Sequence, residues 1–320
     1  MALIKNYYRS YVGSKFRYVR RMLRHRLRGQ PRVCPNCGPS AQVSRLQRKK
    51  IVVDILKCSE CRLIFRWPLD TPEELDVHYE SEFAEAAPQV RLPDSRELEA
   101  LLKIDFASMF SDLSPKIGLL RSVRPRGRVL DLGCSWGYAT YLLRKNGYDA
   151  VGFEISRSRA AYARKHLAIP VIDSPAELES LPSGSFDIIY SNHVLEHLPS
   201  IGKSLTLCAR LLRDDGVAFH FLPNFTGAAA RSGLWLEWIG EDHPIAPTAE
   251  FFELALPAAG FRRFQFASSP FDEEVVAAIT GQSGRWPQLD GYELLIVAHK
   301  SDLKGTIDAP SRENLVSLSG

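Results

Sequence analysis

The sequence predicts an α/β fold in which a doubly wound sheet follows a small metal-binding unit and a basic amphipathic helix. Three observations lead to this prediction. From residue 128 onwards, buried-strand patterns alternate with helical patterns. Two CxxC pairs lie upstream of that alternation. An arginine-rich segment with helical periodicity precedes both pairs.

The first 50 residues contain 14 of the 41 lysines and arginines and no aspartate or glutamate, so the net charge of +4 conceals a local concentration of positive charge. A helix over residues 1–28 is predicted, because apolar residues recur three or four apart, at Tyr8, Val12, Phe16, Val19, Leu23 and Leu27. Such a helix suits an anionic membrane surface. The stripe could equally dock on the body of the protein. Nucleic-acid binding and a mitochondrial transit peptide are the other interpretations.

Four of the six cysteines form two CxxC pairs separated by 20 residues: Cys34, Cys37, Cys58 and Cys61. Two such turns offer four thiolates to a tetrahedral ion, and the spacing matches the zinc-ribbon pattern. We therefore expect a structural zinc, with Gly38 permitting the tight turn and residues 49–57 forming a ribbon strand. Two disulfides or a redox CxxC are the competing interpretations. Cys134 and Cys208 are expected to be ordinary buried thiols.

Composition divides the chain into five predicted segments. The basic helix occupies residues 1–32, the zinc ribbon 33–69, and an acidic connector with helices 70–125. Within that connector, residues 95–123 have continuous helical periodicity. The main domain covers 126–300, and 301–320 is expected to be a flexible tail. No apolar run approaches the roughly 18 to 20 residues of a membrane span, and no secretory signal pattern is present, which predicts a cytoplasmic protein with possible peripheral membrane contact.

The main domain begins with a predicted strand at residues 128–133 and a helix that Gly147 closes. A second strand follows at 150–154, and then a helix capped by Ser156. Further strands are predicted at 170–172, 186–192, 217–223, 261–267 and 292–300, with helices at 204–216 and 248–260. In a sheet wound in this way, the ligand is expected at the carboxyl ends of the strands.

The first strand-to-helix turn, DLGCSWG at residues 131–137, bears on the class of ligand. A dinucleotide fold would show GxGxxG, but Ser135 and Tyr138 occupy the second and third glycine positions. The turn reads DxGxxxG and resembles the first motif of class I S-adenosylmethionine-dependent methyltransferases. Their cofactor has no diphosphate, so the turn need only bring backbone N–H groups and a helix N-terminus near its carboxylate. Gly133 and Gly137 would permit that close approach.

Other segments resemble the same family, over roughly residues 126–300, and its small-molecule branch in particular. Glu154 ends the second strand, where the resemblance implies a carboxylate that accepts both ribose hydroxyls. Asp173 resembles the acid that meets the adenine amino group. The run 181–200 resembles the fourth motif of the family. The implied cofactor-binding residues are Asp131, Gly133, Gly137, Glu154, Asp173 and Asn192.

The ribbon and residues 65–83 resemble the zinc-bearing front end of bacterial methyltransferases associated with glycan or natural-product pathways. The resemblance therefore implies a Rossmann-like methyltransferase sheet behind a zinc-ribbon-like domain. S-adenosylmethionine and a structural Zn²⁺ are the expected cofactors.

The segment SNHVLEHLPS at residues 191–200 contains HxxEH, a zinc-peptidase signature. A peptidase needs this motif along an established helix, whereas here it begins where a strand ends, which places His193 in a turn. Some quinone-pathway methyltransferases carry ExxEH at this place and hold a divalent ion near the acceptor. A metal here therefore stays open. The simpler interpretation is that Glu196 and His197 organise the helix start and the cofactor pocket.

Methyl transfer is an in-line displacement that depends on alignment of acceptor, methyl and sulfur. A hydroxyl acceptor also benefits from a base, for which imidazole is suited. Candidate catalytic residues are His193, His197 and His243. His243 is favoured because residues 233–247 follow the fifth strand, where family members place an acceptor-covering insertion. Trp235 and Trp238 could wall a pocket there or pack in the core.

The sequence thus predicts an S-adenosylmethionine-dependent methyltransferase that acts, at oxygen, on a small-molecule, sugar or glycan, or lipid-linked acceptor. The alternative is an RNA- or nucleic-acid-binding methyltransferase that uses the ribbon and the basic N-terminus. The fourth motif reads SNHV and contains no NPPY-like tetrad, which favours the first interpretation. A non-catalytic scaffold is a third interpretation.

Overall fold

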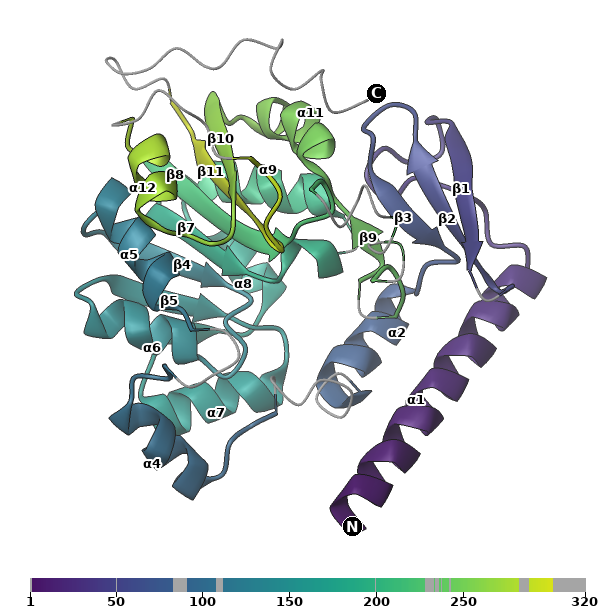
Figure 1. Cartoon of the computed structure of the whole chain (residues 1–320), viewed down its shortest axis with the longest axis horizontal. Coiled ribbons are helices and arrows are strands. Elements are labelled where there is room, and N and C mark those ends of the chain that lie inside the picture. Colours follow the sequence, from purple (N-terminus) through teal and green to yellow (C-terminus); the bar gives the residue numbers. More distant parts are fainter. Residues whose placement is uncertain are drawn as a thin grey trace.

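The computed structural model describes residues 2–49, 51–82, 91–107, 112–198, 200–227, 233, 236, 238–241, 243–281 and 288–301. The side chains of residues 2–12, 14, 76, 81 and 82 lie outside this description. The described residues form two sheets, one of seven strands and one of four. Figure 1 shows the smaller sheet and the N-terminal helix along one side of the larger α/β unit.

The larger sheet has the strand order β10-β11-β8-β7-β4-β5-β6. Five neighbouring strands are parallel, whereas β11 runs antiparallel to both β8 and β10. The strands are β4 (Arg128–Leu132), β5 (Asp149–Phe153), β6 (Val171–Ile172), β7 (Phe186–Asn192), β8 (Leu212–Pro223), β10 (Arg263–Ser268) and β11 (Glu293–His299). The predicted doubly wound sheet is confirmed, and the carboxyl ends of β4, β5 and β7 share one edge.

Helices cover both faces of this sheet because neighbouring residues of its strands point to opposite sides. Leu130 and Ile189 belong to one apolar cluster, whereas Val129 and Ile188 belong to the other. The first cluster includes α8 (Pro175–Ser180), α9 (Ile201–Leu211) and α11 (Ala249–Ala259). The second includes α4 (Ser95–Lys103), α5 (Ser114–Val123), α6 (Tyr138–Lys145), α7 (Arg157–Leu167) and α12 (Glu273–Ile279).

The N-terminal unit consists of α1 (Ala2–Leu27) and an antiparallel sheet of β1 (Val43–Lys49), β2 (Val53–Cys58), β3 (Ile64–Trp67) and β9 (Ile245–Ala246). The ribbon strand predicted over residues 49–57 is confirmed as β2, which begins only at Val53. The chain turns between β1 and β2, and Ile51 takes a left-handed φ of 66° there. The connector then forms α2 (Pro72–Val77) and a π-helix, η1 (His78–Glu82).

Two further helix predictions need correction. The helix predicted over 204–216 ends at Leu211, because Leu212 is fully buried and already pairs with Phe186 in the sheet. The continuous periodicity over 95–123 contains two helices, α4 and α5. Asp105 and Phe106 have φ values of 51° and 61° between them, which ends α4.

The cap of α7 also differs from the prediction. Ser156 occupies the N-cap position, but its side chain makes no capping hydrogen bond. Instead, the backbone N–H of Arg157 donates to the Glu80 carboxylate at 2.8 Å. The connector therefore contributes directly to the start of a helix at the carboxyl edge of the sheet.

Helix α1 docks on the protein through a face other than the predicted stripe. Tyr18, Met22 and His25 are buried, whereas Phe16 and Leu27 are exposed. The buried face packs on the β1–β2 hairpin and the segment before β9. The interpretation that the stripe docks on the body is therefore wrong for the part of the stripe that the structure describes.

Asp54 connects α1 to the small sheet. Its fully buried carboxylate accepts hydrogen bonds from Arg26 at 3.2 Å, Arg32 at 3.1 Å and Arg48 at 2.9 Å. Burial alone would raise the pKa of Asp54, but the hydrogen bond from Arg48 and the charge of Arg26 outweigh burial and lower it. The charged form is thus favoured by the fold.

We expect Asp54→Asn to lower the free energy of unfolding of the N-terminal unit by about 2 kcal/mol. The cost should stay below that of a fully enclosed ion pair, because Arg32 and Arg48 are half exposed. Urea unfolding followed by tryptophan fluorescence measures the change. Asp149→Asn is the control, since this exposed carboxylate pairs with arginines only at 3.6 and 3.7 Å. Equal destabilisation by both substitutions would contradict the role of Asp54.

Candidate active site

The turn from β4 into α6 lies at the carboxyl edge of the sheet. The backbone N–H groups of Gly133 and Cys134 both donate to the carbonyl of Phe153, at 2.8 and 2.9 Å. Ser135 then takes a left-handed φ of 52°, and Gly137, with a φ of 92°, is the N-cap residue of α6. This turn thus holds β4, β5 and α6 together.

The structure gives a different reason for the two glycines than close approach to a ligand. A Cβ on Gly133 would lie 2.5 Å from Val194 Cγ2, and one on Gly137 would lie 2.3 Å from Ile169 Cδ1. Both residues also need positive φ angles. Packing within the protein and backbone conformation therefore require glycine at both positions.

Glu154, directly after β5, faces the same turn. Its two carboxylate oxygens accept hydrogen bonds from the backbone N–H groups of Ser135, at 2.9 Å, and Ser156, at 2.8 Å. Burial raises the pKa of Glu154, although the Ser156 hydrogen bond and the positive charge of Arg159 oppose that effect. Each oxygen keeps a second acceptor position, which suits it to a pair of ligand hydroxyls.

The other predicted cofactor residues have different surroundings. Asp131 is buried in β4 and accepts a hydrogen bond from the Thr140 hydroxyl at 2.6 Å, and burial raises its pKa to about 7. Asp173, after β6, forms an ion pair with Arg164 at 2.7 Å. Asn192 ends β7, where its side-chain oxygen accepts from Lys116. Asp131 therefore connects β4 to α6 through Thr140. Asp173 and Asn192 lie at the carboxyl ends of β6 and β7.

The turn also contains a polar atom that suits a ligand. The buried hydroxyl of Ser135 has no hydrogen-bond partner among the residues that the structure describes. Buried polar groups are nearly always hydrogen-bonded. The Ser135 hydroxyl and the spare acceptor positions of Glu154 thus fit a polar cofactor that lies over the ends of β4 and β5.

A buried carboxylate, Glu196, lies beside this turn in the short 3-10 helix η3 (Leu195–His197). The side chain is fully buried, and His193 Nδ1 and His197 Nε2 lie 3.3 and 3.8 Å from its Oε1. Burial alone would raise the pKa of Glu196. Pairing with His193 and the nearby histidine charges outweigh burial and lower it to about 2. Glu196 is therefore ionised at neutral pH.

His193, just after β7, adopts a left-handed φ of 56° and lies between two carboxylates. Besides Glu196, its Nε2 contacts Glu293 at 2.7 Å, and Glu293 also accepts from Lys116 at 2.5 Å. Burial lowers the pKa of His193, but the pairing with Glu196 and Glu293 outweighs it and raises the pKa to about 9. His193 is therefore an imidazolium at neutral pH, which makes it a poor proton acceptor.

Lys116 and Glu293 were missed in the sequence. Lys116 lies on the buried face of α5 among apolar residues, and Glu293 begins β11. A lysine on the apolar face of a helix was the available signal for Lys116. No motif marks Glu293, because its role comes from the antiparallel addition of β11 to the sheet.

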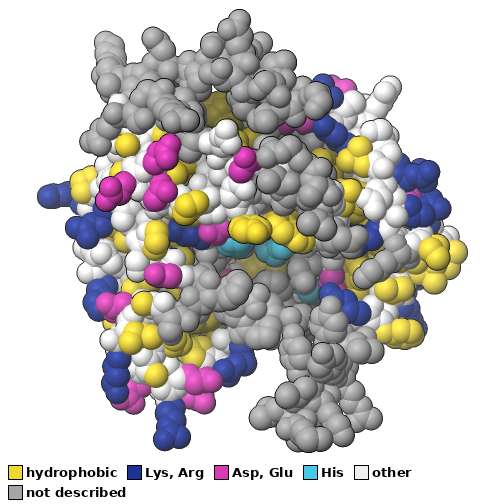
Figure 2. All heavy atoms as spheres, viewed as in Figure 1, with side chains coloured by type: hydrophobic (Ala, Val, Ile, Leu, Met, Phe, Trp, Pro, Cys, Tyr) yellow, Lys and Arg dark blue, Asp and Glu magenta, His cyan; other side chains and the backbone are white. Residues whose placement is uncertain are grey.

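His243 comes from the segment before β9, yet it lies beside His197, with ring centroids 5.0 Å apart. Glu196, His197 and His243 place one ligand atom each within 4.8 Å of one another. These three groups could share a proton or accommodate a cation. A zinc peptidase would use both histidines of the HxxEH motif as ligands, but only one of them, His197, belongs to this group. Figure 2 shows histidine side chains gathered near the centre of the face viewed.

The small sheet determines where His243 lies. β3 pairs with β9 through Phe65 and Ile245, and the backbone N–H of Arg66 donates to the carbonyl of Pro244 at 2.9 Å. On the other side of His243, the buried carboxylate of Glu241 pairs with Lys15 of α1 at 3.0 Å. The N-terminal unit thus holds the segment that carries His243 against η3.

The four cysteines predicted as metal ligands converge in this unit. The sulfur atoms of Cys34, Cys37, Cys58 and Cys61 lie within 4.8 Å of one another. Cys34, Cys58 and Cys61 are buried, and their side chains belong to the same apolar cluster as α9 and α11. The group of four cysteines is zinc-ribbon-like, because four thiolate donors at this separation suit a tetrahedral ion.

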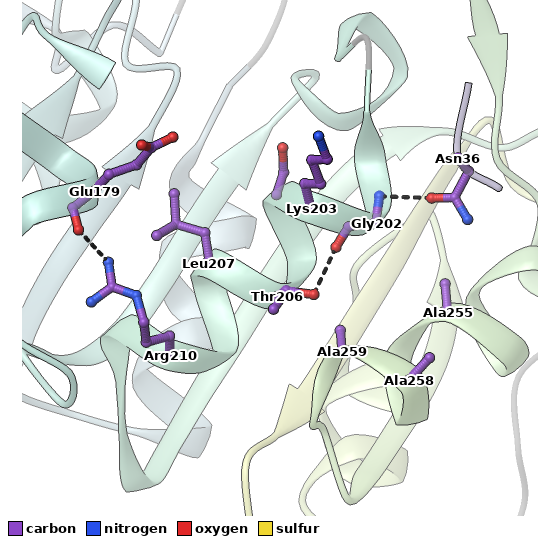
Figure 3. Close-up of a pocket in the computed structure, with 11 residues that line it drawn as sticks. Asn36, Glu179, Gly202, Lys203, Thr206, Leu207, Arg210, Ala255, Ala258 and Ala259 are labelled. Atoms are coloured by element: carbon purple, nitrogen blue, oxygen red, sulfur yellow. Dashed lines mark hydrogen bonds between the residues drawn. The ribbon is translucent and has the colours of Figure 1, made fainter. Parts of the chain in front are cut away.

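The first CxxC turn also contacts α9, one of the helices that cover the larger sheet. Its Asn36 accepts a hydrogen bond from the backbone N–H of Gly202, at 2.9 Å, in the first turn of α9 (Figure 3). Residues of α9 and α11 line a groove of about 610 Å³. Figure 3 shows Asn36 at one end of it. Neither Glu154 nor any of the clustered histidines lines this groove, so it lies apart from the carboxyl edge.

The two tryptophans proposed to wall a pocket have separate outcomes. Trp235 lies outside the described residues. Trp238 is partly buried against the cluster of Tyr18 and Met22, and its ring lies edge-on to Phe225, with centroids 6.3 Å apart. Trp238 therefore packs in the core beneath the segment of His243.

A family model described as "Methyltransferase domain" matches residues 92–265, more than half of the chain. The match includes the turn after β4, Glu154 and the histidine cluster. It begins downstream of the four cysteines and α1.

Two curated relatives are named "Ubiquinone biosynthesis O-methyltransferase". The one from Methylococcus capsulatus is 31% identical over 99 residues, which cover 29% of this chain and 41% of the relative. The one from Sinorhizobium fredii is 30% identical over 122 residues, covering 35% of this chain and 49% of the relative. The chain thus spans less than half the length of either relative.

Among solved structures, an S-adenosylmethionine-dependent methyltransferase from Archaeoglobus fulgidus is 21% identical, with a TM-score of 0.42. That similarity covers 61% of this chain and 98% of the other. The chain belongs to the methyltransferase domain family.

Proposed function

We propose that this chain is an S-adenosylmethionine-dependent methyltransferase that transfers a methyl group to a hydroxyl oxygen of a small-molecule, sugar or glycan, or lipid-linked acceptor. The observation that carries this proposal is the buried carboxylate of Glu196 beside the paired rings of His197 and His243 at the carboxyl edge. A hydroxyl must lose a proton as it is methylated, and an imidazole next to an ionised carboxylate suits that task. The names of the two O-methyltransferase relatives support an oxygen acceptor.

The bound cofactor supplies an electrophilic methyl group on a sulfonium centre. The proposal assigns Glu154 to the two ribose hydroxyls and the turn from Gly133 to Gly137, with the Ser135 hydroxyl, to the remaining polar groups. Asp173 is assigned to the adenine side. The protein's main contribution is alignment, because in-line displacement requires a fixed approach of acceptor to methyl.

His243 is assigned as the proton acceptor in preference to His193, because the raised pKa of about 9 keeps His193 protonated at neutral pH. Glu196 would stabilise the imidazolium that forms on His243. His197 contacts both groups: its ring centroid lies 5.0 Å from that of His243, and its Nε2 lies 3.8 Å from Glu196 Oε1. The acceptor hydroxyl is then expected within hydrogen-bond reach of His243.

The four cysteines are proposed to hold one structural zinc ion. Metal binding there would fix the turn that carries Asn36 and the strand pairing of β3 with β9. The zinc would therefore stabilise the arrangement around His243 without taking part in the reaction, since four thiolates leave no open coordination position.

Glu154→Gln should weaken binding of S-adenosylmethionine by about 10- to 100-fold, because hydrogen bonds to a charged acceptor are lost. Isothermal titration calorimetry measures the affinity, and circular dichroism checks the fold. Glu99→Gln, an exposed glutamate on α4, should bind like the wild type. Wild-type affinity in the Glu154 variant would refute the assignment.

Protein purified without chelators should contain about one zinc per chain by plasma emission spectrometry. Cys58→Ser should lose most of that metal, because a hydroxyl replaces one thiolate ligand. Cys208→Ala, at a buried thiol outside the cluster, should keep it. Metal-free wild-type protein would exclude the site.

His243→Asn should lower the rate of methyl transfer by about 10²- to 10⁴-fold while cofactor affinity stays unchanged. Cell extract incubated with methyl-labelled cofactor, then fractionated into small molecules, lipid, polysaccharide and RNA, identifies the acceptor for the rate measurement. His166→Asn is the control, because the His166 ring stacks on Tyr162 of α7 and does not belong to the group of Glu196, His197 and His243. Label that appears only in RNA would favour the nucleic-acid alternative, and an unchanged rate would remove His243 from the reaction.

A further inference from the structure

Helix α1 has two faces with opposite surroundings. Tyr18, Met22 and His25 are buried and fix one face to the protein. Polar contacts reinforce this attachment, since His25 contacts Glu74 at 2.7 Å and Arg21 contacts Asp70 at 2.7 Å. The helix therefore has a fixed rotation about its own axis, and the residues on its opposite side are held outward.

The opposite side carries large apolar side chains in water. Phe16 is 70% exposed, and Leu27 is 78% exposed. Val19 and Leu23, at 36% and 43%, lie between them at helical spacing. These four are among eleven large hydrophobic side chains that are exposed in the described part of the chain. Contiguous exposed apolar surface of this kind indicates an interaction site.

Arginines accompany this stripe. Arg17, Arg20, Arg24 and Arg28 are all exposed, and successive members lie three or four residues apart, next to the apolar positions. The first acidic residue in the chain is Asp54, so α1 contains no compensating acid. We call the four apolar residues together with these four arginines the outer α1 face.

We propose that the outer α1 face lies in the headgroup layer of a bilayer that contains anionic lipid. Apolar side chains flanked by arginines are the arrangement by which an amphipathic helix binds such an interface. The helix has 26 residues and is about 39 Å long, enough to lie along the surface. Figure 1 shows α1 at the edge of the molecule, where a flat surface can reach it.

The combination of arginines and apolar side chains argues against RNA or a second copy of the chain as the partner of this face. RNA would engage the arginines but would leave Phe16 and Leu27 in water. A second copy of the chain would bring two rows of arginine together, which is repulsive. None of the described helices has the length and apolarity to cross a bilayer. Binding along the membrane surface would bury the apolar side chains and place the arginines beside anionic headgroups.

The test is sedimentation of the full chain with extruded vesicles. Phosphatidylcholine vesicles that contain about one third phosphatidylglycerol should bind the protein, and pure phosphatidylcholine vesicles should bind it weakly. Leu23→Gln with Leu27→Gln should lower the partition coefficient on anionic vesicles by about tenfold or more. Arg20→Gln should lower it by about fivefold. Leu254→Gln, at an exposed leucine of α11, should have no effect.

Unchanged vesicle binding in the double leucine variant would overturn the proposal. Binding to polyuridylate RNA without binding to anionic vesicles would overturn it in favour of nucleic acid. A wild-type dimer that the double variant abolishes in analytical ultracentrifugation would assign the face to self-association. Thermal unfolding and cofactor calorimetry should match the wild type, because the altered side chains are exposed and distant from Glu154 in the sequence. Vesicle binding and methyl transfer can thus succeed or fail separately.

Discussion

The fully buried charge of Glu196 is the constraint on which the site depends. A carboxylate without access to water is stable only when charges or hydrogen bonds compensate it. Compensation comes chiefly from the pairing with the His193 imidazolium at the end of β7, while His197 in η3 and His243 in the segment before β9 place ring nitrogens within 4.8 Å of the carboxylate. Each of these positions has its own support. Lys116 and Glu293 hold His193, whereas the pairing of β3 with β9 and the contact of α1 with Glu241 hold the segment of His243.

This arrangement gives the N-terminal unit a role in the site without giving it a reacting group. The cysteine cluster, β3 and α1 all lie outside the parallel sheet, yet they hold the segment that carries His243, one of the three histidines near Glu196. The cofactor half of the site is independent of them, because Glu154 and the turn from Gly133 to Gly137 are held by β4, β5 and α6. This half of the candidate site therefore needs no contact with the cysteine cluster, β3 or α1, whereas the half that contains His243 depends on them.

Much of the fold followed from local patterns. Alternating buried strands and helices predicted the wound sheet, and the spacing of four cysteines predicted their convergence. Errors arose where a tertiary contact outweighed local preference. Residues 212–216 have a polar, helix-like pattern, but pairing of Leu212 with Phe186 draws them into β8. The α1 stripe was the most apolar face by spacing, yet the buried positions are Tyr18, Met22 and His25, where hydrogen bonds and ion pairs add to burial.

Within the candidate site, the sequence identified residues at motif positions but not the interactions that determine their charge. His193, His197 and His243 were all candidate bases, and the sequence favoured His243 only from the position of its segment after the fifth strand. Only the structure shows that Glu293 contacts His193, because β11 reaches the sheet from 100 residues further along the chain. Asp131 also matched its motif, but its burial under Thr140 is a property of packing. Long-range pairing is the information that the motif lacks.

Gly202 and Asn36 show how closely the two units are fitted. A Cβ on Gly202 would lie only 2.4 Å from the side-chain oxygen of Asn36, so a larger residue at position 202 would displace that side chain and disturb the hydrogen bond between the two units. The two positions are 166 residues apart, yet a change at one restricts what is tolerated at the other. The ribbon is consequently not an exchangeable module: a homologous front end grafted onto this catalytic sheet would have to bring a compatible partner for that glycine.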